Sequence, residues 1–124
     1  KGKWPVSVHD VRQQAAQQHL LDGANWAGSA AEIADNCDVI FSCLPDLHAI
    51  ESVCLGDNGI LSRARADTAL FEMSTNSRDL VARLHGAFAQ RGVHFLDAPI
   101  SGGAAGAVSG RLAMWVGRSA MRVA

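Results

Sequence analysis

The sequence has no long hydrophobic run, no block of basic residues and only three cysteines among its 124 residues. Its apolar stretches are as short as strands, far below the ~20 residues that span a bilayer. A net charge of −1 without a basic cluster gives no reason to expect a nucleic acid or a membrane as partner. Cys37, Cys43 and Cys54 are odd in number, and together with His48 they lack zinc-site spacing. We therefore expect reduced thiols in a cytoplasmic protein, and no bound metal.

The sequence also lacks a glycine-rich turn with the spacing G-x-G-x-x-G, which binds the pyrophosphate of a dinucleotide at a helix N-terminus. The nearest string, Ser101-Gly102-Gly103-Ala104-Ala105-Gly106, has Ser in the first glycine position. It lies late in the chain, and no acidic residue follows it at the spacing of about 20 residues that the motif requires. We therefore do not interpret it as a pyrophosphate-binding turn.

Strand and helix signals alternate along the chain, and its length fits one domain, residues 1–124. Strands are predicted at residues 5–10, 24–27, 38–44, 68–73, 93–96 and 112–116. Helices are predicted at residues 11–22, 29–36, 46–55 and 78–91, with a helical turn at 104–109. This alternation predicts an α/β fold, with a doubly wound parallel sheet, right-handed crossovers and helices on both faces.

Two local patterns support individual elements. Ser29 and Glu32 fit a capping box, in which the serine accepts from a backbone amide and the glutamate reaches back toward the start of the helix. The run from Asp38 to Leu44 is almost continuously apolar, which is typical of a strand covered on both faces. Cys43 is therefore predicted to be buried.

The segment from Asp97 to Gly103, Asp-Ala-Pro-Ile-Ser-Gly-Gly, carries the most specific signal in the chain. It follows a strand signal, and ligands of open α/β sheets bind outside the carboxyl ends of the strands. Glycines allow close approach to the backbone, and Ser101 adds a hydroxyl donor. This combination predicts a site for an anion or a carboxylate.

Together with Leu44-Pro45 and Ser74-Thr75, this segment resembles the β-hydroxyacid dehydrogenases, the group of 3-hydroxyisobutyrate dehydrogenase and relatives of 6-phosphogluconate dehydrogenase. The resemblance runs from about Val6 to Gly117. It implies a Rossmann-type NAD(P)-binding domain of an oxidoreductase that transfers a hydride between the cofactor and a small β-hydroxyacid such as 3-hydroxyisobutyrate. It also implies that the full-length protein is a homo-oligomer.

Asp10 ends a strand signal where a Rossmann domain has the carboxylate that binds the cofactor ribose. Such a carboxylate repels the extra phosphate of NADP, so NAD is the expected cofactor, although Arg12 is placed to pair with that phosphate. The alternative is that Asp10 only caps a helix that begins at Val11.

The resemblance implies that the backbone at Leu44 and Pro45 lies along the cofactor ribose, and that Ser74 and Thr75 lie beside the nicotinamide. The alternatives are local. Pro45 is also suited to a turn that starts a helix, and Ser74 or Thr75 to capping the next helix, although Ser77 already suits that role.

Ser101, Gly102 and Gly103 are implied by the resemblance to bind the acid group of the substrate, with a flexible glycine-rich linker as the alternative. The general acid/base of the family is a lysine on a helix after the nucleotide-binding domain. The only lysines here are Lys1 and Lys3, at the opposite end of the chain, so no catalytic residue is predicted.

The position of Asp10 also implies that the glycine-rich turn and the first strand precede Lys1, and that the helical catalytic and dimerisation domain is absent. We then expect an unfilled sheet position, two unpaired strand edges, marginal stability and no activity for these residues alone. Two other classes remain open at this point. One is a non-catalytic nucleotide-binding or scaffold module, and the other is a gene fragment without function.

Overall fold

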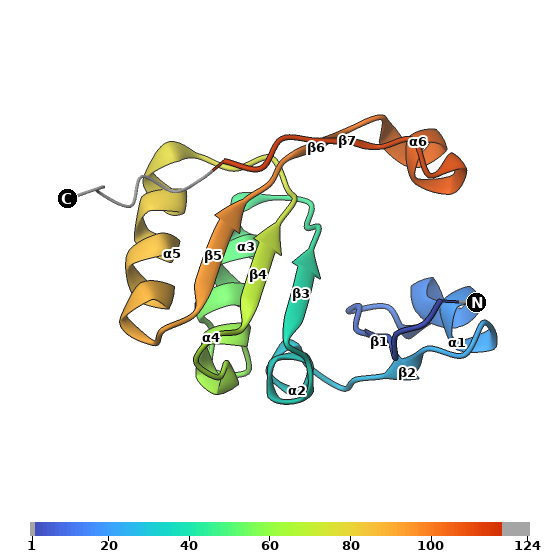
Figure 1. Cartoon of the computed structure of the whole chain (residues 1–124), viewed down its shortest axis with the longest axis horizontal. Coiled ribbons are helices and arrows are strands. Elements are labelled where there is room, and N and C mark those ends of the chain that lie inside the picture. The colour runs from blue at the N-terminus through green and yellow to red at the C-terminus, as the bar shows by residue number, and fades with distance from the viewer. Residues whose placement is uncertain (1, 118–124) are drawn as a thin grey trace.

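The computed structural model describes residues 2–117 and consists of strands that alternate with helices (Figure 1). The strands are β1 (Ser7–Val8), β2 (Asn25–Trp26), β3 (Val39–Ser42), β4 (Ala69–Glu72), β5 (His94–Asp97), β6 (Ile100–Ser101) and β7 (Ala113–Met114). The helices are a 3₁₀ turn at Gln13–Ala16, α1 (Gln17–Leu21), α2 (Ala30–Asn36), α3 (Leu47–Leu55), α4 (Ile60–Arg63), α5 (Arg78–Gln90) and α6 (Gly103–Ser109).

The parallel strands are divided between two sheets. β3, β4 and β5 form a three-stranded parallel sheet in which Ile40 lies opposite Leu70, and Leu70 opposite Phe95. β1 and β2 form a separate parallel pair, to the side of β3 in Figure 1. β6 and β7 pair antiparallel above the carboxyl ends of the larger sheet. The alternation and the parallel pairing confirm the predicted α/β class. In the described part of the chain, however, helices cover only one face of the larger sheet, whereas the sequence predicts helices on both faces.

The hydrophobic core lies on the face of the larger sheet that α3 and α5 cover. In α5, Leu80, Leu84 and Phe88 are buried at four-residue spacing, so that they line one side of the helix. Phe88 stacks on Phe95 of β5 with the ring centroids 5.7 Å apart. The Ser77 hydroxyl accepts a hydrogen bond from Leu80 N at 3.2 Å and caps the helix, as the sequence predicts.

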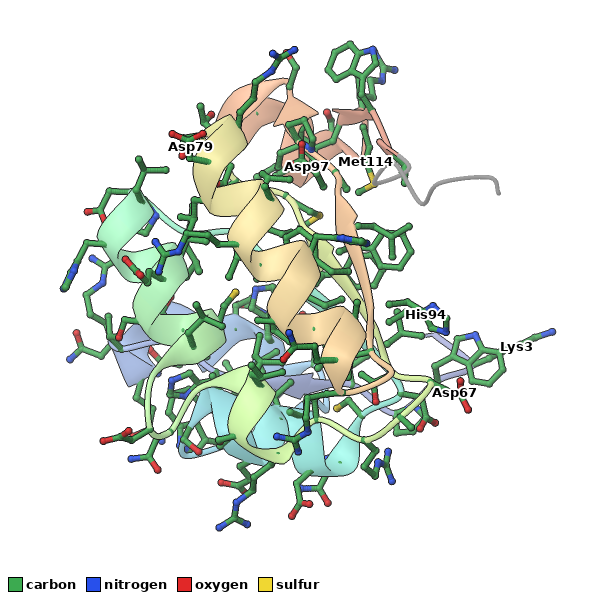
Figure 2. All side chains as sticks on the ribbon, turned by 90° about the vertical axis from the view of Figure 1, so that its left-hand side faces the viewer. Lys3, Asp67, Asp79, His94, Asp97 and Met114 are labelled. Atoms are coloured by element: carbon green, nitrogen blue, oxygen red, sulfur yellow. The ribbon has the colours of Figure 1, made fainter. Side chains whose placement is uncertain are left out.

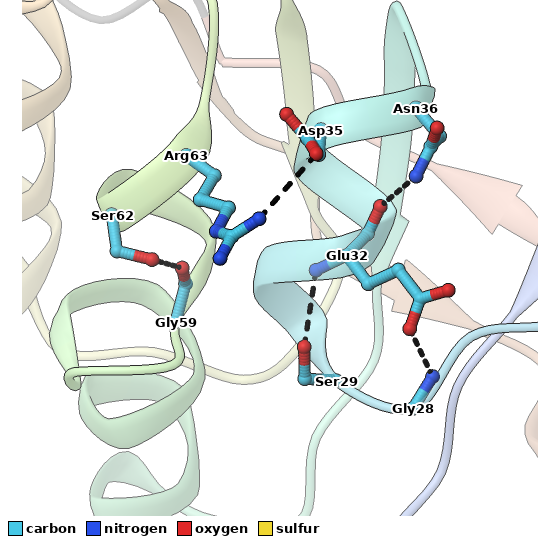
Figure 3. A network of polar contacts seen from close by, with 8 residues as sticks. All are labelled: Gly28, Ser29, Glu32, Asp35, Asn36, Gly59, Ser62 and Arg63. Atoms are coloured by element: carbon cyan, nitrogen blue, oxygen red, sulfur yellow. Dashed lines mark hydrogen bonds and ion pairs between the residues drawn. The ribbon is translucent and has the colours of Figure 1, made fainter.

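The capping box predicted for α2 is present in part, because Glu32 binds the amide of Gly28 and not that of the capping residue Ser29 (Figure 3). Ser29 Oγ accepts from Glu32 N at 3.1 Å, and Glu32 Oε2 accepts from Gly28 N at 2.7 Å. An ion pair of 3.5 Å between Arg63 and Asp35 joins α4 to the same helix. The sequence does not predict α4, because a helix of four residues is too short for a periodic signal.

The opposite face of the larger sheet is open, and the prediction that residues 38–44 are covered on both faces is wrong for the described structure. Ile40 and Ser42 are buried, whereas Val39 and Phe41 are 52% and 58% exposed. Cys43 is exposed, not buried. Among residues 2–117 no helix covers Val39 and Phe41, and an apolar sequence does not reveal whether its partner surface is present.

The outer edge of β3 is open as well. Asp38 O and Ser42 O accept hydrogen bonds from β4 and the residue after it, at 2.9 and 2.8 Å. Because alternate residues of a strand point their main-chain groups to opposite sides, those of Val39 and Phe41 point away from β4. No strand within the described part of the chain pairs with them.

Several expected elements are shorter than predicted, most clearly the first helix and the first strand. The helix expected from residue 11 begins at Gln13 as a 3₁₀ turn and continues as α1, which contains no buried residue. β1 covers two residues of the expected six. None of the helices between residues 2 and 117 combines the length and the apolar character that crossing a bilayer requires.

Candidate functional site

A buried polar network joins the carboxyl ends of β3 and β4. Ser42 Oγ donates a short hydrogen bond to Glu72 Oε2, and Ser74 N donates to Glu72 Oε1 at 2.8 Å. Leu44 N donates to Ser74 Oγ at 2.7 Å. The network therefore brings together Leu44 and Ser74, which the sequence predicts from two separate motifs.

Sequence reasoning does not identify Ser42 and Glu72. Glu72 is fully buried although it carries a carboxylate. Glu72 lies inside the strand sequence Thr-Ala-Leu-Phe-Glu-Met. A charged side chain at an inward-facing strand position is rare and usually has a specific partner, so this position is the feature of the sequence that could have identified it.

Pro45 and Thr75, the neighbours of the two joined residues, are exposed at the same edge of the sheet. The turn that starts a helix remains an alternative for Pro45, which lies in the bend directly before α3, whereas neither Pro45 nor Thr75 caps a helix. Asp46 caps α3 through a bond from Ala49 N at 2.8 Å, and Ser77 caps α5. The predicted cofactor loops therefore leave Pro45 and Thr75 free of a capping role.

The Asp10 carboxylate accepts a hydrogen bond from Arg12 N at 2.8 Å and forms a local turn after β1. It does not cap a helix at Val11, since the first helical turn begins only at Gln13 and has Arg12 as its flanking residue. The turn holds Oδ1 of the carboxylate, and the side chain is half-buried.

The Ser101-Gly102-Gly103 segment is an ordered turn, which argues against a flexible linker. Ser101 pairs with Ala113, and Gly106 N donates to Gly102 O at 2.9 Å. Gly102 has φ 129° and Gly103 has φ 59°, in the region that favours glycine. All three residues of the segment are exposed.

Replacing Gly102 by Ala is expected to disrupt this turn at a cost of about 1–3 kcal/mol, because of its positive φ. A Cβ there would also lie 3.2 Å from Leu112 Cδ2. The measurement is amide hydrogen exchange at Gly106, which should become faster. Gly86→Ala is the matched control, since Gly86 lies in α5 with nothing within 4 Å of its Cβ position. It should leave Gly106 unchanged and slow exchange in α5; equal effects of both changes would contradict the assignment.

The structure does not gather all the predicted residues into one cavity. A cavity of about 400 Å³ is lined by residues of α5 and its flanks, namely Asn76, Ser77, Arg78, Val81, Ala82, His85 and Asp97. A second of about 370 Å³ is lined by Pro5, Ser7, Asn25, Trp26, Ala27, Glu32 and Asn36. Neither contains Asp10, Thr75 or Ser101, so their meeting in one cofactor site stays a prediction.

Of the two lysines in the chain, the structure describes Lys3. Figure 2 shows Asp97 at one end of β5 and Lys3 toward the other end, on the side of His94 and Asp67. Lys1 lies outside the described residues. In this view Lys3 and Asp97 do not lie together.

Among residues 2–117, two titratable groups have clearly shifted pKa values. Burial, together with a smaller effect of the Glu72 carboxylate, raises the pKa of Cys54 to about 12, so this thiol is not a nucleophile at neutral pH. Burial also raises the pKa of Asp97. Among residues 2–117, no three His, Cys, Asp or Glu side chains form a group that would hold a metal ion.

Comparison with known proteins identifies a family. The family model of the NAD binding domain of 6-phosphogluconate dehydrogenase matches residues 1–123. The NAD-dependent L-serine dehydrogenase of Pseudomonas aeruginosa is 36% identical over 120 residues, which are 97% of this chain and 40% of that protein.

Solved structures of similar sequence have the same fold. The 3-hydroxyisobutyrate dehydrogenase of Mycobacterium tuberculosis with L-serine matches at a TM-score of 0.77 and 32% identity, over 90% of this chain and 37% of that one. A complex with NADP+ and 2-OPP matches at a TM-score of 0.84 and 30% identity, over 92% of this chain and 40% of that one. The chain thus spans about 40% of the length of these relatives.

Proposed function

Since the chain belongs to the family of the NAD-binding domain of 6-phosphogluconate dehydrogenase, we propose that it is the cofactor-binding part of a cytoplasmic enzyme that transfers a hydride between NAD(P) and a small β-hydroxyacid. The observation that carries the proposal is the hydrogen bond between Leu44 N and Ser74 Oγ at 2.7 Å. It holds two loops side by side at the carboxyl edge of a parallel sheet, where such sheets bind ligands.

The residues at this edge fit a dinucleotide. Pro45 and Thr75 are exposed next to the bonded pair, and the Thr75 hydroxyl is able to donate or accept beside a nicotinamide. The cofactor, when bound, supplies the nicotinamide carbon that gives or takes the hydride. Pro45 and Thr75 would contact that ring and orient it.

Asp10 makes NAD the proposed cofactor. Its Oδ1 is held by Arg12 N, so the carboxylate has a fixed position after β1 and is suited to accept from ribose hydroxyls. A negative charge at this place disfavours the additional phosphate of NADP. One similar protein is NAD-dependent and another was solved with NADP+, so the choice rests on Asp10 itself.

Ser101, Gly102 and Gly103 are proposed to bind the substrate carboxylate. Two successive glycines with positive φ expose backbone amides, and Ser101 adds a hydroxyl. The general acid/base and the rest of the substrate pocket would come from a helical domain outside this chain, and the position between β1 and β3 would hold a further strand. We propose that the complete protein is a homo-oligomer.

The test is dinucleotide binding to the complete polypeptide that contains this chain, measured by calorimetric titration with NAD and NADP. Asp10→Ala is expected to weaken NAD binding about tenfold or more, because charge-assisted hydrogen bonds contribute about 1.5–3 kcal/mol. NADP binding should weaken less or improve. The matched control is Asp57→Ala, an exposed aspartate in the turn after α3.

Two results would contradict parts of the proposal. No binding of either dinucleotide by the unmodified protein would overturn it altogether. Tight binding without hydride transfer to any short β-hydroxyacid or its oxidised form would favour a non-catalytic nucleotide-binding module.

A further inference from the structure

Glu72 is a buried carboxylate without a cationic partner among the described residues. Its exposed fraction is 0%, and it lies on β4, the central strand of the larger sheet. None of the ion pairs formed between residues 2 and 117 includes it. Burying a carboxylate costs several kcal/mol, so the residue needs a reason other than packing.

The hydrogen bonds that Glu72 accepts connect it to residues at the ends of two strands. Its Oε2 accepts from the Ser42 hydroxyl, and its Oε1 accepts from the Ser74 amide at 2.8 Å. Ser42 is the last paired residue of β3, and Ser74 follows the end of β4. One carboxylate therefore binds the ends of two neighbouring strands.

Glu72 fixes the loops at Leu44-Pro45 and Ser74-Thr75 through its hydrogen bond with Ser74. Because the Ser74 amide is bound to Glu72, the Ser74 backbone is fixed and its hydroxyl oxygen lies 2.7 Å from Leu44 N. The strand pairing of β3 with β4 ends at Ser42 and Glu72, and Met73 N donates to Ser42 O as the last main-chain bond between them. Beyond that point, the bond from Leu44 to Ser74 is what joins the loops.

We propose that Glu72 is a positioning residue for the cofactor site, which through Ser74 sets the separation of the loops at Leu44-Pro45 and Ser74-Thr75. This inference rests on the proposed function for its consequence in binding. Its structural part, the coupling of Glu72 to the Leu44 amide, does not depend on any ligand.

Two substitutions at Glu72 separate positioning from simple stability. Glu72→Leu removes both acceptors and fills similar space with an apolar side chain, at a cost of about 1–3 kcal/mol for each buried donor left without a partner, the Ser42 hydroxyl and the Ser74 amide. Glu72→Gln keeps the carbonyl oxygen for Ser74 N and turns the other group into a donor. The Ser42 hydroxyl is able to rotate and accept from that donor, so Gln should preserve the network.

The first measurement is amide hydrogen exchange at Leu44 in the complete protein. Glu72→Leu should accelerate it at least tenfold while the core amides of Leu70 and Phe95 keep their protection, and Glu72→Gln should restore it. Thr68→Val is the matched control, because Thr68 is a buried polar residue adjoining the amino end of the same strand. It should leave Leu44 unchanged. Unaltered exchange at Leu44 in Glu72→Leu would overturn the coupling.

The second measurement is the dissociation constant for NADH with the same variants. At a temperature where all the variants are folded, Glu72→Leu should raise it about tenfold, and Glu72→Gln should lie near the unmodified protein. Adding Ser74→Ala to Glu72→Leu should have little further effect, since residues of one network are not additive. Normal NADH binding by Glu72→Leu would overturn the positioning role. Failure of the unmodified protein to bind NADH or NADPH would instead overturn the proposed function and leave the exchange result to decide the coupling.

Discussion

Heated on their own, residues 1–124 are expected to unfold over a broad temperature range, with a calorimetric enthalpy well below the roughly 87 kcal/mol typical of a globular chain of this length. The reason is that part of the apolar surface of the sheet is not buried. One face of the larger sheet leaves Val39 and Phe41 more than half exposed, and the outer edge of β3 pairs with no strand among residues 2–117. β1 and β2 stand as a separate pair, and an isolated pair of short strands is marginal in water.

Differential scanning calorimetry checks this expectation, and the complete polypeptide is the control. There the transition should be sharp, with calorimetric and van't Hoff enthalpies that agree. A sharp, cooperative transition of residues 1–124 alone would show that the open face and edge matter little to stability.

Phe88→Ala should abolish the remaining folded structure of the same 124 residues, whereas Phe41→Ala should not. Phe88 is fully buried and stacks on Phe95, and truncation of such a side chain costs about 3–5 kcal/mol. A chain of marginal stability does not withstand that loss. Phe41 is 58% exposed, so its truncation removes little buried area and should cost less than about 1 kcal/mol.

The two phenylalanines form a matched pair, since the same atoms are removed from Phe88 of α5, which packs on the covered face of the sheet, and from Phe41 of β3 on its open face. Amide hydrogen exchange at Leu70, on the central strand, is a suitable measurement at low temperature. Protection should be lost in Phe88→Ala and largely kept in Phe41→Ala. Equal loss in both variants would mean that the open face carries as much stability as the helix-covered one.

The sequence predicts the strand and helix order well because each element has its own local signal. Ser29 with Glu32 and Ser77 with the periodic Leu80, Leu84 and Phe88 identify their helices without reference to the rest of the fold. The exposure of Phe41 was not predictable in this way. An apolar strand has the same sequence whether its second face is covered or open.

The candidate site was predictable in part. Leu44 and Ser74 come from motifs 30 residues apart, and the structure joins them by a hydrogen bond. Glu72, which holds Ser74, escapes prediction because its partners are a distant strand and a main-chain amide, and neither leaves a pattern in the sequence. The common cleft of Asp10, Thr75 and Ser101 stays a prediction, since neither of the two cavities described above is lined by any of them.

The larger sheet and its covering helices come from one uninterrupted stretch, Val39 to Asp97. Pairing two neighbouring strands of this sheet closes the loop of chain that connects them. The entropy cost of closing such a loop rises only slowly with its length. This segment is therefore able to form its sheet and core before the strands β1, β2, β6 and β7 have paired. The order of assembly during synthesis would then begin in the middle of the sequence and extend outward.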